Sequence, residues 1–264
     1  MGKIAAVAMV TVRDILRRKI LYFVLLILLI VLYFSLQGNA WVKMAEEAGE
    51  LDSANKMRSE AVILIIQFFT NFGEFFSLFF ASTALSADIK ERTLTAILAR
   101  PVERWQYILG KWIGVVGFVS AFISAGVVLG LALAGIYDVH LPTVFWLGIL
   151  ESYVRVVFFS AVCVGFSVRL PPILAGTTAF FLTFLPKLVE SQLTHPNPIA
   201  RSAAAAVYYL SPAVMPVELL NLGKELRDPS YGLYAKILLE NTLYAMAVLL
   251  LGCRFFMKRD VPVK

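Results

Sequence analysis

Long apolar runs alternate with short polar stretches along the chain. The apolar runs cover residues 20–36, 61–84, 112–136, 143–168, 173–189 and 234–256. Each is close to or longer than the roughly 20 residues with which a helix crosses the hydrocarbon core of a bilayer. The runs are continuously apolar rather than alternating, which is typical of membrane helices and not of barrel strands. The pattern predicts an all-α polytopic membrane protein, with six transmembrane helices in a single domain, 1–264.

An amphipathic segment, residues 1–19, precedes the first run. Its apolar and charged side chains recur at helical spacing on opposite sides: Ile4, Val7, Ala8, Val12, Ile15 and Leu16 on one, and Arg13, Asp14, Arg17 and Arg18 on the other. Such a helix is expected to lie in the plane of the membrane interface. The run 20–36 is longer than a typical signal-peptide core. Although Gly38 and Ala40 loosely resemble a cleavage site, we favour an uncleaved anchor.

Charged residues between the runs predict the orientation of the chain. One set of segments comprises the N-terminal segment, residues 87–111, the Arg169 turn and the C-terminal tail. It contains about twice as many lysines and arginines as the loops expected on the opposite side. Such cations favour the cytoplasmic side. Both termini and residues 87–111 are therefore expected inside a bacterial or archaeal cell, with the chain in the plasma membrane. The polar loop 37–60 and the proline-broken loop 190–232 are expected outside, the latter packed over the ends of the spans.

Composition supports the membrane interpretation. The chain is 59% hydrophobic and only 16% charged, whereas soluble domains carry about 25% charged residues. The net charge of +6 would suit nucleic acid, but the cations flank apolar spans, so we expect contact with membrane lipid and none with nucleic acid. The two cysteines, Cys163 and Cys253, lie inside apolar runs and define neither a disulfide framework nor a zinc site. No metal site is expected.

The polar interruption at residues 87–111 reads ADIKERTLTAILARPVERWQYILGK. Asp88 is in position to cap a short helix, with Glu91 three residues on as in a capping box. Arg100 precedes a proline, which pushes it out of the helical region, so this helix is expected to end there. Pro101 then suits the first turn of a second helix, with Glu103 near its N-terminus.

This stretch resembles the corresponding part of the ABC-2 type ABC transporter permeases. The residues that carry the resemblance are Glu91, Thr93, Leu94, Leu98, Pro101, Val102, Arg104, Gly110 and Lys111. Arg92 departs from the glycine that many members have before the threonine. The resemblance implies the membrane subunit of an exporter that works as a dimer with a second permease copy or homologue and two ATPase subunits.

In that family the first cytoplasmic loop is a coupling helix that contacts the ATPase. By resemblance, the contact residues here are Glu91, Arg92, Thr93, Leu94, Leu98, Arg100, Pro101 and Arg104. The turn near Arg169 and Pro171 would make a second, smaller contact. The alternative is an ordinary cationic loop that only fixes topology; the Pro-Val-x-Arg and Gly-Lys combination favours coupling.

The residues independently indicate a separate motor. A phosphate loop needs glycine five residues before a Gly-Lys pair, but Trp105 stands before Gly110 and Glu218 before Gly223. The chain is therefore expected to be no enzyme and to bind no cofactor itself, with ATP and Mg²⁺ on the partner ATPase.

Polar residues inside the spans are candidates for structure or for a substrate path. Gln67, Asn71 and Glu74 share one helical face. Glu151 and Arg155 are four residues apart in the favourable order for an ion pair. We favour the interpretation in which these groups neutralise one another and bond neighbouring helices, with Arg155 also able to tie the second and fourth spans through Glu74. The sharper hypothesis is that Glu74 and Arg155 line a central substrate path.

Four glycines in the third span, Gly114, Gly117, Gly126 and Gly130, leave room for close helix approach, and we favour packing within the subunit over a dimer seam. Two other functions compete with ATP-driven export. One is a channel or scaffold without ATP coupling. The other is an intramembrane enzyme. Two observations argue against it: the two histidines, His140 and His195, both lie in loops expected outside the membrane, and the sequence has no catalytic motif.

Overall fold

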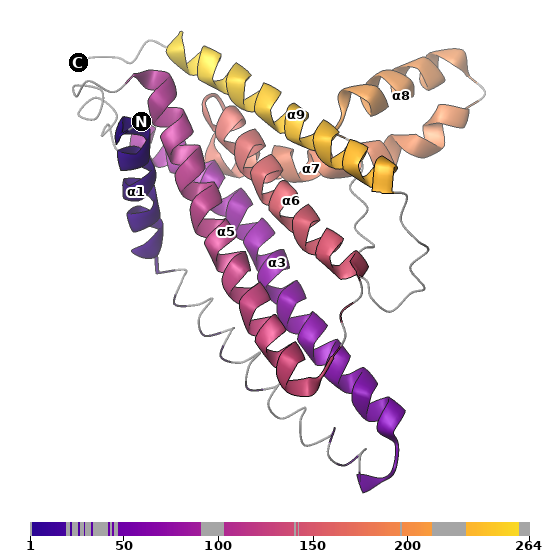
Figure 1. Ribbon diagram of the computed structural model, residues 1–264. Coiled ribbons are helices and arrows are strands. Elements are labelled where there is room, and N and C mark those ends of the chain that lie inside the picture. The colour runs from indigo at the N-terminus through magenta and orange to yellow at the C-terminus, as the bar shows by residue number, and fades with distance from the viewer. Residues whose placement is uncertain are drawn as a thin grey trace.

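The fold is described by a computed structural model over residues 2–19, 22, 26, 29, 33, 42, 44, 47–90, 103–139, 141, 143–195, 197–212 and 231–258. The regular elements in this part of the chain are all helical. In order they are α1 (Gly2–Leu16), α3 (Leu51–Lys90), α5 (Arg104–Tyr137), α6 (Thr143–Ser167), α7 (Pro172–Glu190), the 3-10 helix η1 (Ser191–Thr194), α8 (Pro198–Leu210) and α9 (Tyr231–Met257), as Figure 1 shows. The all-helical expectation is confirmed for these residues.

Four helices are long and apolar enough to cross a membrane, and they lie within α3, α5, α6 and α9. A fifth is added if the bent pair Pro172–Thr183 and Leu188–Thr194 counts as one span. The expected first span, 20–36, lies almost wholly outside the described residues. Six spans therefore remain a prediction.

Two helices are longer than their apolar runs. α3 has 40 residues and α5 has 34; at 1.5 Å per residue they measure about 60 Å and 51 Å, against a hydrocarbon core of about 30 Å. The expected polar loop 37–60 is thus wrong for residues 51–60, which form the start of α3. This stretch contains neither glycine nor proline, so nothing in it stops a helix.

The expected short helix capped by Asp88 is also wrong at its start. Asp88 lies within α3, which continues to Lys90, and its carboxylate contacts the side chains of Tyr107 and Lys111 of α5. At the other side of the interruption, α5 begins at Arg104, and Gln106 Oε1 accepts a hydrogen bond from the Glu103 amide at 3.3 Å. Pro101 and the rest of residues 91–102 lie outside the described residues.

The expected fifth span is bent rather than straight. Its two parts, Pro172–Thr183 and Leu188–Thr194, meet at 50°. Pro186 lies at the bend, where a proline removes a backbone hydrogen bond and clashes with the preceding turn. α8 packs back against α7 and η1. Part of the loop 190–232, which is expected outside, is therefore helical.

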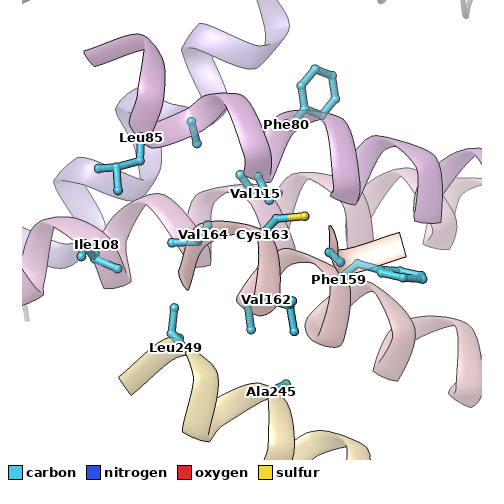
Figure 2. Close-up of a cluster of buried hydrophobic side chains, with 14 of the residues drawn as sticks. Phe80, Leu85, Ile108, Val115, Phe159, Val162, Cys163, Val164, Ala245 and Leu249 are labelled. Atoms are coloured by element: carbon cyan, nitrogen blue, oxygen red, sulfur yellow. The ribbon is translucent and has the colours of Figure 1, made fainter. Parts of the chain in front are cut away.

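The core is centred on α6, which packs against α3, α5, α7 and α9. Figure 2 shows Phe159, Val162, Cys163 and Val164 among side chains of the neighbouring helices. The labelled neighbours are Phe80 and Leu85 from α3, Ile108 and Val115 from α5, and Ala245 and Leu249 from α9. α6 is therefore the central helix of the described bundle.

α1 packs lengthwise on the first turns of α5 (Figure 1). Its packed side includes Val7, Thr11 and Ile15, with Thr11 donating to the Val7 carbonyl at 2.9 Å. Leu16, on the expected apolar face, is 57% exposed, as a side chain facing lipid would be, so this face stays a prediction. Thr11 is buried because it faces Gly114, where there is room only for a small side chain. The position of α1 relative to the bilayer remains a prediction.

Glycines allow close contacts between helices. A Cβ atom at Gly126 would lie 2.0 Å from Phe69 Cγ, and one at Gly130 would lie 2.3 Å from Ile66 Cγ1, so both let α5 approach α3. Gly114 lets α5 approach α1 in the same way. Packing within the subunit is thus confirmed for these three glycines. Among the described residues no atom lies within 4 Å of a Cβ position at Gly117, so its packing stays a prediction.

A matched pair of alanine variants tests this packing. Gly126→Ala places a methyl group against Phe69 and should lower the free energy of unfolding by about 1–3 kcal/mol, the usual cost of overpacking. Gly117→Ala, in the same helix, should leave stability unchanged or raise it by up to about 1 kcal/mol through helix propensity. Reversible unfolding in mixed detergent micelles measures both. Equal stability of the two variants would contradict the close α3–α5 approach.

Candidate functional site

Three charged side chains meet inside the helix bundle. Arg155 of α6 lies between Glu151, one turn earlier on the same helix, and Glu74 of α3. Its Nη1 donates to Glu74 Oε1 at 3.3 Å and Oε2 at 3.4 Å, and its Nε donates to Glu151 Oε1 at 3.1 Å. Nη2 also contacts Glu151. We call these three residues the intramembrane triad; the structure contains both pairings that the sequence suggested.

The three side chains of the triad are largely buried. The exposed fractions of the side chains are 12% for Arg155, 15% for Glu74 and 2% for Glu151. In an apolar medium an isolated charge is very costly, so each charge here depends on the others. The planar guanidinium suits this role because it offers several donors in fixed directions to two carboxylates at once.

Neighbouring polar contacts extend this connection to other helices. The Tyr234 hydroxyl of α9 donates to the Leu147 carbonyl, one turn before Glu151. Ser124 of α5 and Tyr153 of α6 share a hydrogen bond of 2.7 Å between their hydroxyl oxygens. The polar groups at this level therefore join α3, α5 and α9 to α6.

Gln67 and Asn71, the other two candidate residues of the second span, are not joined to the triad by any hydrogen bond described here. Gln67 is half-buried and Asn71 is exposed, although both lie on the Glu74 side of α3. Of the three, Glu74 alone contacts Arg155 in the described hydrogen bonds. The geometry suits a structural tie between helices, and the role of all five residues in a substrate path remains a prediction.

Most of the expected coupling residues, Glu91, Arg92, Thr93, Leu94, Leu98, Arg100 and Pro101, lie outside the described residues. Arg104 is the first residue of α5, and its Nη1 donates to the Met257 carbonyl of α9 at 3.2 Å. The Arg169 guanidinium lies 4.0 Å from the centre of the Phe255 ring of α9. Arg104 and Arg169 therefore both lie at the same end of α9.

Sequence reasoning missed the partners of two residues beside the coupling segment. Asp88 was expected as a helix cap and Lys111 as part of a Gly-Lys motif, but they form an ion pair of 2.7 Å between Lys111 Nζ and Asp88 Oδ2. Tyr107 also donates to Asp88. The only signal in the sequence was that Tyr107 and Lys111 are one helical turn apart, so they share a face.

The apolar helices and the charged triad that they enclose define a multi-pass helical membrane protein. The family model of the ABC-2 family transporter protein matches residues 5–261 of this chain. The chain therefore belongs to the ABC-2 family of transporter proteins, whose members are membrane components of transporters. Comparison with curated proteins gives no match.

A double-mutant cycle tests the triad as a tie. Arg155→Gln leaves two buried carboxylates without their cation and should lower the free energy of unfolding by about 3–5 kcal/mol. Adding Glu74→Gln to Arg155→Gln should recover part of that loss, because it removes one stranded charge.

Lys236→Gln is the control, since Lys236 forms an exposed ion pair with Glu240 in α9 and its loss should leave stability unchanged within error. Unfolding in mixed micelles measures these three variants together with the single variant Glu74→Gln, which completes the cycle. Strict additivity of the Glu74 and Arg155 changes would contradict the tie.

Proposed function

We propose that the chain is the permease subunit of an ATP-driven exporter, in which separate ATPase subunits supply the energy. Family membership supports a transporter component. The absence of a phosphate loop from the sequence supports a motor on another chain, where ATP and Mg²⁺ bind. The chain itself carries the membrane path and binds no nucleotide.

The ATPase acts on residues 91–102, between α3 and α5. This segment contains most of the residues that carry the family resemblance, and both flanking helices are longer than a membrane crossing requires. A push on the segment would tilt α3 and α5, and α6 would follow because the triad ties it to α3. Movement of packed helices as rigid bodies is a common form of such transitions.

Both termini face the cytoplasm of a bacterial or archaeal cell, and the chain lies in the plasma membrane. The excess of cations in the terminal and 87–111 segments supports this orientation. The fold agrees with it, because α1 packs at Gly110 and the end of α9 lies at Arg104, both near the start of α5. Two copies, or one copy and a homologue, form the path between them.

Purification from the native host tests the motor. The wild-type chain, extracted in mild detergent, should retain a subunit that mass spectrometry identifies by its phosphate-loop motif, together with Mg²⁺-dependent ATP hydrolysis. Leu94→Asp should lose that subunit, because a carboxylate is costly in an apolar contact.

Ile199→Asp is the matched control, because Ile199 is 77% exposed on α8, in the loop expected outside the cell. This variant should retain the ATPase. A wild-type preparation without an ATPase would instead support a channel or scaffold. Loss of the ATPase in both variants would contradict the assignment of the contact to residues 91–102.

A further inference from the structure

Three side chains join α3 to α5 on either side of the coupling segment. Asp88 of α3 pairs with Lys111 of α5 at 2.7 Å, and its carboxylate also accepts a hydrogen bond from Tyr107. Lys111 Nζ lies 5.7 Å from the centre of the Tyr107 ring. We call Asp88, Tyr107 and Lys111 the α3–α5 clasp.

The clasp is enclosed by protein. The exposed fraction is 6% for the Lys111 side chain and 17% for that of Asp88, and Tyr107 is only 1% exposed. The Tyr107 ring stacks on Phe256 of α9 with 6.5 Å between ring centres. Enclosure to this extent makes the ion pair less accessible to screening by salt than a pair on the surface.

α1 packs against the clasp from another side. Gly110, between Tyr107 and Lys111, has no room for a Cβ atom because Val7 of α1 would lie 2.6 Å from it. Arg18, just after α1, donates to Thr83 Oγ1 of α3 at 2.7 Å. Burial lowers the pKa of Arg18, whereas Asp14 and Asp88 raise it, so the clasp carboxylate also lies within electrostatic reach of Arg18.

The place of the clasp along the chain gives it a mechanical consequence. Asp88 is two residues before the end of α3, and Tyr107 is three residues after the start of α5. The clasp therefore fixes the two helix ends between which residues 91–102 run. A load on that segment reaches both helices together only if these ends are held to each other.

We propose that Asp88, Tyr107 and Lys111 are positioning residues for energy coupling, which hold α3 and α5 together as one lever under the ATPase. The inference rests on the proposed function and adds the residues that transmit the load. The clasp stays closed through the transport cycle. The Gly-Lys pair of the motif then has a role at each position: Gly110 admits α1, and Lys111 holds Asp88.

Charge exchange tests the pairing. Asp88→Lys and Lys111→Asp should each lower the melting temperature of the purified chain, and the two together should restore most of it. The same exchange at the exposed pair Lys236 and Glu240 should change nothing. If the double variant at the clasp is no more stable than the single ones, the pair does not join the helices and the inference is wrong.

A cleavable cross-link tests the coupling role. The variant carries Asp88→Cys and Lys111→Cys, with Cys163→Ala and Cys253→Ala to remove the native thiols. The chain is purified with its ATPase, and ATP hydrolysis is measured well below the melting temperature. With both cysteines reduced, the part of ATP hydrolysis that depends on the permease should be mostly lost. It should return after a short bismethanethiosulfonate bridges the two cysteines. It should fall again when dithiothreitol cleaves the bridge.

The outcomes separate the two proposals. A cross-link that restores the melting temperature but not ATP hydrolysis would show a purely structural clasp and overturn the positioning role. Inhibition by the cross-link would show that the clasp must open, which also overturns it. Absence of an ATPase from the wild-type preparation would overturn the proposed function itself, and the coupling role with it.

Discussion

Charges away from water must find their partners within the protein, and this constraint organises the described bundle. Arg155 meets it by reaching Glu74 on a neighbouring helix and Glu151 on its own. Near the end of α3, Asp88 meets it through Lys111 and Tyr107 of α5. Glu74 and Asp88 lie about 21 Å apart along α3 at 1.5 Å per residue. α3 is thus joined to α6 at Glu74 and to α5 at Asp88.

Close packing at glycines also joins the helices. Lipid tails are as apolar as leucine side chains, so the hydrophobic effect does little to bring membrane helices together, and small residues that permit close approach do more. Gly126 and Gly130 serve α3, and Gly165 and Gly252 bring α6 and α9 into backbone contact. A bundle joined in this way moves as connected rods, which suits a subunit that receives force from outside the membrane.

The apolar runs predicted the described spans well, because a bilayer requires long continuous apolar segments. The Glu74–Arg155 pair could also be foreseen, since so few charges lie in the spans that few partners exist. The end of α3 could not be foreseen. Asp88 was interpreted from its neighbours in sequence, whereas its partners, Tyr107 and Lys111, come from the next helix. The burial of Thr11 was missed for a related reason, because Gly110 and Gly114 of α5 select which side of α1 is packed.

The central claim is that force enters from the cytoplasm between α3 and α5, and the side on which that segment lies tests it most directly. Single cysteines at Thr95 and at Asp52, an exposed residue near the opposite end of α3, would be placed in a chain without its native thiols. In intact cells a membrane-impermeant maleimide should label the Asp52→Cys chain, and should label the Thr95→Cys chain only after the membrane is opened. Equal labelling of both in intact cells would contradict the account.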